Sequence, residues 1–164
     1  VQTDISKKFL AMAQKSWQLN NLPKDHYRIL PGDFYKISNR MRREEKLFDC
    51  VILDPPFFSV TNAGRVDLEN ETTRVINKVR PLIAHHGIMI VINNALFLSG
   101  ADFMEELLTV CQSAYLSLEQ TIDVPIDVIG FPNTIVAKPP IDPHPFNHPT
   151  KIALIRVQRK DERC

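Results

Sequence analysis

The sequence predicts one α/β domain built on a mostly parallel sheet. Short apolar runs alternate with amphipathic helical patterns through residues 1–114, which is the order that a parallel sheet with covered faces requires. The chain has 164 residues, of which 44% are hydrophobic, and this is enough for one core but not for two. No apolar run approaches the roughly 18 residues of a membrane-spanning helix. We therefore expect residues 1–164 to form a single domain with no membrane partner.

Four strands are expected in the first part of the chain. Residues 48–53 and 87–92 are short apolar runs, rich in β-branched residues and bounded by turn signals. Residues 26–30 form a weaker run that stops at a proline-glycine pair. Residues 1–3 have the character of the tail of a fourth strand. Cys50, inside the run 48–53, is expected to be buried.

Helical patterns lie between these runs. Ser6 can cap a helix that extends to about residue 20, with one apolar face made by Phe9, Leu10, Ala13 and Trp17. Further helices are expected over about 68–84 and 101–114, and the first of these two would end with His85 and His86. The charged stretch 36–46 is expected to form a solvated helix rather than an RNA-binding surface.

The C-terminal part has a different organisation. Residues 115–124 and 151–158 are expected to be the last two strands. Between them, the segment 125–150 holds seven of the twelve prolines and is predicted to be an insertion without regular structure. Such a loop either contacts RNA bases or is an ordered surface loop with no ligand. Its candidate contact residues are Phe131, Asn133, His144, Phe146 and His148.

Charge and cysteine content narrow the function classes. Twenty lysines and arginines against 19 acidic residues give a net charge of +1, which excludes a strongly basic nucleic-acid binder but not a local basic patch. Three widely spaced cysteines without a CxxC pair predict reduced thiols in a cytoplasmic protein. His144 and His148 are four residues apart, but the prolines that follow them exclude a shared helical face, so no metal site is expected.

The strongest chemical signal is the sequence Asp54-Pro55-Pro56-Phe57-Phe58, which directly follows the predicted strand 48–53. Ligands bind at the carboxyl ends of strands in parallel α/β sheets. Two prolines fix the backbone, so that a carboxylate, a rigid carbonyl and an aromatic face converge. Such a group can hold a planar ring that carries an amine. The alternative is a strand end that the prolines terminate, with both phenylalanines buried.

Two further acids follow other predicted strands. Asp4 precedes the first helix, where a carboxylate can accept hydrogen bonds from ribose hydroxyls. Asp33 follows a proline-glycine pair and can accept from an exocyclic adenine amine. Either acid alone is a weak signal, because aspartate often caps helices and fills turns. Together with Asp54, they are expected to line one pocket.

The segments VQTDIS, PGDF, FDCVILDPPFF and GIMIVINNALF resemble the class I S-adenosylmethionine-dependent methyltransferases. More narrowly, they resemble the branch that modifies large-subunit ribosomal RNA at cytosine or guanine. The resemblance implies a Rossmann-like sheet, mostly parallel with an antiparallel last strand. It also implies S-adenosylmethionine as the cofactor and RNA, in the narrower resemblance ribosomal RNA, as the substrate. By resemblance, the cofactor residues are Asp4, Ile5, Asp33, Phe34 and Asp54; the catalytic residues are Asp54, Pro55 and Phe57; and the substrate-binding residues are Phe58, Asn93 and Asn94.

The chain departs from this family in one respect. Its five glycines contain no GxGxG, the loop that approaches the methionine end of the cofactor after the family's first strand. We therefore expect the first βα unit to be absent and the chain to be the C-terminal part of a longer enzyme. A second copy supplying the missing strand, in a homodimer, is the alternative.

Three functions remain open at this point. The first is methyl transfer to a nitrogen of an RNA base. Neither Cys50 nor Cys111 follows a proline, which argues against a covalent mechanism at a cytosine carbon. The second is methylation of a protein or small molecule, although that motif usually begins with asparagine. The third is a catalytically idle module that binds RNA or another partner.

Overall fold

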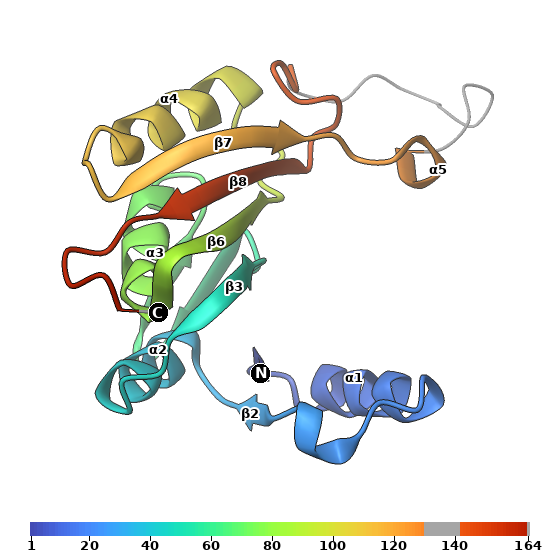
Figure 1. The fold of residues 1–164 in the computed structure, drawn as a ribbon. Coiled ribbons are helices and arrows are strands. Elements are labelled where there is room, and N and C mark those ends of the chain that lie inside the picture. Colours follow the sequence, from blue (N-terminus) through green and yellow to red (C-terminus); the bar gives the residue numbers. More distant parts are fainter. Residues whose placement is uncertain (130–141, 164) are drawn as a thin grey trace. The chain divides into compact units, whose positions relative to one another are not determined.

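A computed structural model describes residues 1–129 and 142–163 (Figure 1). The chain divides into two compact units. The first comprises Val1–Lys46 and Thr61–Gly64, and the second comprises Leu47–Val60 and Arg65–Cys164. The strands form an α/β structure with a mixed sheet, as the sequence predicts.

The first unit is a βαβα arrangement. Strands β1 (Gln2–Asp4) and β2 (Ile29–Pro31) pair in parallel, with Asp4 opposite Pro31. Helix α1 (Lys7–Leu19) begins at the predicted cap, where the side chain of Ser6 accepts from the backbone of Phe9 at 3.3 Å. A 3₁₀ turn (Lys24–His26) leads into β2, and helix α2 (Phe34–Arg43) follows it.

The predicted apolar face of α1 is only partly buried. Leu10 is buried, and Trp17 packs on Tyr27 with their ring centroids 4.3 Å apart. Phe9, however, is 60% exposed, so the predicted apolar face is not buried as a whole. Helical spacing puts Phe9 on the same face as Leu10 and Ala13. However, α1 packs on a sheet of only two strands, which is too narrow to cover Phe9 as well as Leu10.

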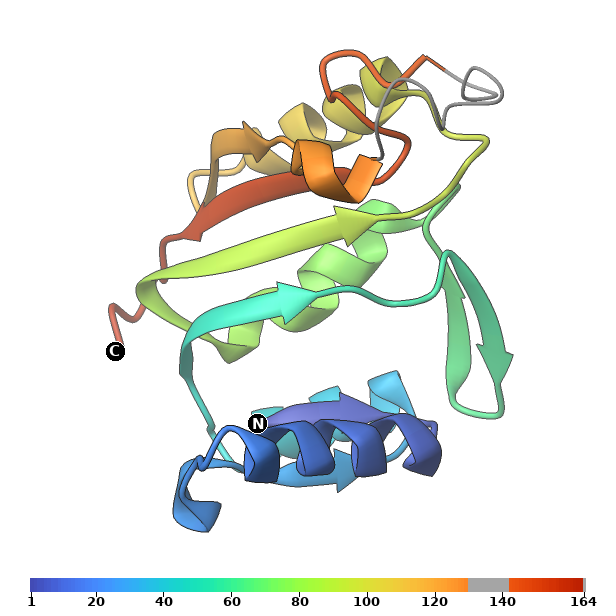
Figure 2. The ribbon, with the colours of Figure 1, turned by 90° about the vertical axis from the view of Figure 1, so that its right-hand side faces the viewer.

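The second unit contains a four-stranded sheet in the order β3-β6-β8-β7. Strands β3 (Phe48–Leu53) and β6 (Ile83–Asn93) are parallel, and β8 (Lys151–Val157) runs antiparallel to both β6 and β7 (Leu116–Ile122). The antiparallel last strand is therefore confirmed. Helices α3 (Thr72–Val79) and α4 (Gly100–Cys111) lie on the same face of the sheet (Figure 2). The fully buried side chains Phe103, Leu107, Met89 and Ile155 form the core between them.

The helix expected over 68–84 is shorter than predicted. Residues that precede it form a hairpin of β4 (Phe58–Thr61) and β5 (Gly64–Asp67), which the sequence analysis did not foresee. Asp67 then accepts the backbone amides of Glu69 and Asn70, and this turn delays the helix to residue 72. Pro81 converts the end of the helix to a 3₁₀ turn (Arg80–Leu82). β6 starts immediately afterwards, so His85 and His86 lie in a strand. Their predicted position at the end of a helix was wrong.

Cys50 is exposed, which contradicts its predicted burial. The apolar run 48–53 was interpreted as a strand covered on both sides. Among the described residues, β3 is instead an edge strand, paired only with β6. A run of apolar residues does not distinguish an edge strand from a central one.

Gly100 is required by a close backbone approach. Its amide donates to the carbonyl of Asp142 at 3.0 Å, and a Cβ at this position would collide with the carbonyls of Pro143 and His144. Gly100→Ala should destabilise the protein by about 1–3 kcal/mol, because the added methyl overpacks against backbone. Helix propensity alone would give the opposite sign, a gain of up to about 1 kcal/mol. Urea unfolding of the variant measures the difference, and a stabilised variant would show that the segment 142–150 does not pack there.

Candidate active site

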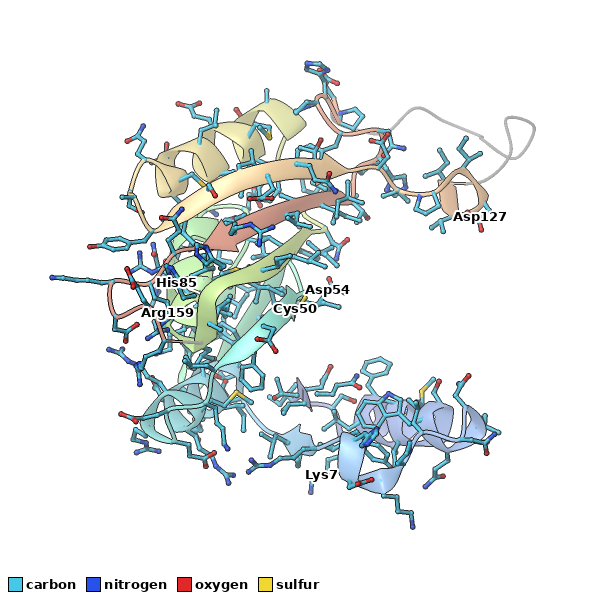
Figure 3. All side chains as sticks on the ribbon, viewed as in Figure 1. Lys7, Cys50, Asp54, His85, Asp127 and Arg159 are labelled. Carbon is cyan, nitrogen blue, oxygen red and sulfur yellow. The ribbon has the colours of Figure 1, made fainter. Side chains whose placement is uncertain are left out.

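The candidate site begins at the carboxyl ends of β3 and β6. These strands are parallel neighbours, with Leu53 opposite Val91, so the residues that follow them emerge at the same edge of the sheet. Asp54 is exposed there (Figure 3), and its Oδ1 accepts a hydrogen bond from Nδ2 of Asn94 at 3.0 Å. This is the one hydrogen bond that the described residues give to the Asp54 carboxylate, which leaves acceptor capacity for a ligand.

An aromatic surface follows this acid. Phe57 is 54% exposed and Phe58 is 51% exposed, so the described residues do not bury them as the alternative interpretation of the motif expected. Pro55 is half-buried. The backbone carbonyl of Phe57 accepts from the amide of Leu68 at 2.8 Å, which fixes the segment against the start of the next turn. The segment thus presents a carboxylate and two aromatic rings from a fixed backbone.

Asn93 has a different place from the one predicted. Its side chain is fully buried and cannot contact a substrate directly. Its Nδ2 donates to the carbonyl of Leu68 at 3.0 Å, and its Oδ1 accepts from the backbone amide of Ala95 at 2.8 Å. Asn93 therefore holds the turn that presents Asn94, since its side chain binds the amide of Ala95, on the other side of Asn94.

The other two predicted acids lie in the first unit. Asp4 ends β1, and its Oδ1 accepts from the amide of Ser6 at 2.6 Å. Asp33 caps α2 by accepting from the amides of Tyr35 and Lys36 at 2.9 and 3.1 Å, and its other oxygen accepts from the hydroxyl of Thr61. Burial acts to raise the pKa of Asp33, but these hydrogen bonds outweigh it and leave the pKa below its usual value.

No family model matches the chain. A protein of Methanocaldococcus jannaschii, named provisionally as a ribosomal RNA large subunit methyltransferase, is 43% identical over 61 residues, which are 37% of this chain and 16% of that protein. Ribosomal RNA large subunit methyltransferase I of Shewanella frigidimarina is 27% identical over 103 residues, 63% of this chain and 26% of that protein. The chain resembles the ribosomal RNA large subunit methyltransferases. It spans about a quarter or less of the length of these two relatives.

The fold of this methyltransferase-like chain agrees with solved structures. The crystal structure of a protein named provisionally as a methyltransferase, in complex with SAH, superposes with a TM-score of 0.76 at 17% identity. The match covers 94% of this chain and 38% of that one. At this identity the likeness concerns the fold alone, and it confirms the fold class that the sequence predicts.

The residues of the first unit fit the ribose side of such a cofactor in part. Asp4 is only partly buried, and Ile5 beside it is 67% exposed, so an acceptor and an apolar surface are available together. Phe34 is half-buried and meets Tyr35 edge-on, with their ring centroids 5.0 Å apart. Asp33 fits less well, because both of its carboxylate oxygens already accept hydrogen bonds within the protein.

Two residues that contact the predicted ones or their neighbours were not foreseen, one in each unit. Thr61 donates to Asp33 from the unforeseen hairpin, so no local pattern could reveal it. Lys151 was assigned only to a strand, yet its side chain is fully buried, and its Nζ donates to the carbonyls of Ala95 and Pro149 at 2.9 and 2.6 Å. The alternation of β8 carried a signal, because Lys151 shares the inward face with Ala153 and Ile155.

Burial lowers the pKa of Lys151 to about 8 from its usual 10.5. The folded protein therefore releases this proton before the unfolded chain does, and stability should rise with pH between about 8 and 10.5. The contribution is about 3 kcal/mol at full effect. Urea unfolding of the wild type and Lys151→Met across this pH range measures the contribution as a difference in the slope of unfolding free energy against pH. Lys160→Met, at an exposed lysine, is the control. Equal slopes in all three proteins would contradict the assignment.

Burial raises the pKa of Cys111, against a hydrogen bond from the backbone of Leu118, so this thiol is a poor nucleophile. Over residues 1–129 and 142–163, no group of three or more side chains is arranged to bind a metal ion. In that same part of the chain, no helix combines the length and apolar character needed to cross a membrane.

The proline-rich segment 125–150 is described at residues 125–129 and 142–150, so Phe131 and Asn133 lie outside the described residues. Residues Ile126–Ile129 form the short helix α5, so the expectation of no regular structure in this segment was wrong at its start. His144 is exposed, and the ring of His148 accepts the amide of Thr150 at 3.0 Å. Phe146 is 5% exposed and packs on Phe103, with their ring centroids 5.6 Å apart. Its predicted role as a contact with RNA bases was therefore wrong, because a core residue of α4 already covers it.

Proposed function

We propose that this chain is the catalytic region of an S-adenosylmethionine-dependent methyltransferase that acts on a base of ribosomal RNA, at a nitrogen. One observation carries the proposal. The exposed carboxylate of Asp54 is held by Asn94, next to the exposed rings of Phe57 and Phe58. This combination suits a planar acceptor that carries an amine, because it offers a carboxylate as hydrogen-bond acceptor and aromatic surface for stacking.

The protein's part in this reaction is to orient the acceptor. The cofactor, when bound, supplies a methyl group on a sulfonium sulfur, which becomes a neutral thioether as the new carbon–nitrogen bond forms. Asp54 and the carbonyl of Pro55 accept the two amine hydrogens, which directs the nitrogen lone pair away from them. Phe57 stacks on a base that has left its helix. After transfer, the surplus proton on the nitrogen passes to solvent. Alignment and exclusion of water account for the catalysis.

The charge distribution supports an RNA substrate. The first unit carries ten lysines and arginines against five acidic residues, a net charge of +5, whereas the second unit carries ten against 14. The near-neutral total of +1 therefore conceals a basic first unit, in which five of the ten cations lie in the stretch 36–46 that the sequence analysis expected to be a solvated helix. A polyanion binds such a surface through its phosphates, independently of sequence. The names of the two relatives supply the choice of ribosomal RNA. The unpaired thiols of Cys50 and Cys111 agree with a cytoplasmic reaction.

Calorimetric titration of S-adenosylmethionine tests the cofactor assignment. It is carried out on this chain and on the longest protein that the gene encodes. Where the gene encodes a longer protein with a GxGxG, we expect that protein to bind with a micromolar-range dissociation constant and this chain, which contains no GxGxG, to bind more weakly. Asp4→Ala in the longer protein should weaken binding about tenfold, since it removes an acceptor for the ribose.

Methyl transfer from labelled cofactor to ribosomal RNA then tests the substrate. Labelled protein or small molecules in place of RNA would show that the acceptor class is wrong. Binding of the cofactor by neither protein would favour the catalytically idle module, in which these acids are ordinary turn residues.

A further inference from the structure

Lys151 is a buried cation without a buried anion. Its side chain has no exposed surface, and its Nζ donates to two backbone carbonyls, those of Ala95 and Pro149. Within residues 1–129 and 142–163 it forms no ion pair with a carboxylate. An apolar side chain would fill the same place without the cost of removing an ammonium group from water. What the ammonium group provides, and an apolar side chain could not, is the pair of hydrogen bonds to these two carbonyls.

One of these carbonyls belongs to the turn that follows β6. The backbone amide of Ala95 is bound by Oδ1 of Asn93, and its carbonyl is bound by Lys151. Both peptide groups of Ala95 are thus fixed from the interior, by two side chains that are themselves fully buried. Asn94 lies between these fixed residues, and its side chain donates to Asp54 at 3.0 Å.

The same network reaches the other side of the site. Nδ2 of Asn93 donates to the carbonyl of Leu68 and lies 3.4 Å from the hydroxyl of Thr72. The amide of Leu68 in turn donates to the carbonyl of Phe57. The segment 54–58 and the turn 93–95 are therefore joined twice, once directly through Asp54 and Asn94 and once through buried groups.

Asn93 and Lys151 also lie side by side on neighbouring strands. They are partners in the register of β6 and β8, so β8 brings the ammonium group to the carboxyl end of β6. The other titratable group joined to this network is Glu106 of α4, which reaches Thr72. Burial raises the pKa of Glu106 against the effect of that hydrogen bond. Lys151 differs from Glu106 because it contacts the turn itself.

We propose that Lys151 is a positioning residue of the candidate site, which fixes the backbone of Ala95 and thereby keeps the amide of Asn94 against Asp54. The role in turnover rests on the proposed function, whereas the coupling within the turn does not. A neutral amine keeps two N–H groups but binds carbonyls more weakly than an ammonium group does. Deprotonation of Lys151 should therefore weaken its hydrogen bond to the carbonyl of Ala95 and change the position of the Asn94 side chain.

The test on the unmodified chain is an NMR titration from pH 6 to pH 11. We expect the side-chain signals of Lys151, the carbonyl carbon of Ala95 and the side-chain amide of Asn94 to shift with one common midpoint, near 8. The proposal is overturned if Lys151 titrates while the Asn94 amide does not follow it. This measurement needs no variant, so it cannot be lost to misfolding.

Variants extend the test to the site. In Lys151→Met, amide exchange at Ala95 should become at least about tenfold faster while exchange in the centre of β6 stays unchanged. Lys151→Arg should restore part of the protection, and the exposed Lys160→Met should alter neither. In the longest protein that the gene encodes, Lys151→Met should lower kcat about tenfold with unchanged cofactor binding. Unchanged exchange at Ala95 would overturn the proposal, whereas an inactive wild type with faster exchange in the variant would instead overturn the proposed function.

Discussion

Replacing Asp54 by alanine should lower the kcat of methyl transfer to RNA by about 100-fold or more, because an acceptor amine that loses its carboxylate partner is no longer aligned. Asp54 makes one hydrogen bond to the protein and lies at an exposed strand end, so its removal should leave the fold intact. Binding of S-adenosylmethionine should change less than about threefold. Steady-state kinetics with ribosomal RNA, together with calorimetry, separate these two effects.

Two variants make this experiment specific. Asp49→Ala removes an exposed aspartate from the opposite end of the same strand and should leave turnover unchanged. Asn94→Ala keeps the carboxylate but removes its partner, so we expect a smaller loss of about tenfold. Normal turnover in Asp54→Ala would remove this residue from the mechanism.

The second large effect is expected in the core. Phe103 of α4 is fully buried and packs on Phe146, so Phe103→Ala should lower the free energy of unfolding by about 3–5 kcal/mol. The loss combines the transfer of the ring with the cavity that remains. Urea denaturation followed by circular dichroism measures it.

Leu108 of the same helix is 55% exposed and provides the matched control. Leu108→Ala should change the free energy of unfolding by less than about 0.5 kcal/mol. Phe146→Ala and the double variant then give the coupling between the two rings, expected at about 0.5–1.5 kcal/mol. Equal effects of Phe103→Ala and Leu108→Ala would show that α4 does not pack on the sheet as described.

Much of the fold was predictable because its signals are local. The run 48–53 and the cap at Ser6 were located to the residue, since apolar periodicity and capping chemistry both act within a few positions. The hairpin of β4 and β5 was missed. Its strands have four residues each, and the segment also contains the beginning of a helical pattern. The exposure of Phe9 and Cys50 depends on which strands lie beside them, which no short stretch of sequence specifies.

The candidate site, like the fold, was predictable only where its signals are local. Asp54 was found because it stands next to two prolines and two phenylalanines in the sequence. Its connection to Asn94 spans 40 residues, and the resemblance to a known family was needed to suggest it. The network of Asn93, Leu68 and Lys151 could not be predicted, because its members come from three separate segments and three of its acceptors are backbone carbonyls.

The position of β8 has a consequence for the synthesis of the protein. β8 lies between β6 and β7, although it follows both in the chain. While the ribosome is still adding residues 123–150, β6 and β7 are complete but lack the strand that joins them. Their unpaired edges are then open to other nascent chains. β8 can pair with both strands only when residue 157 has left the exit tunnel. Chaperone binding during translation should therefore be strongest between the release of β7 and the release of β8.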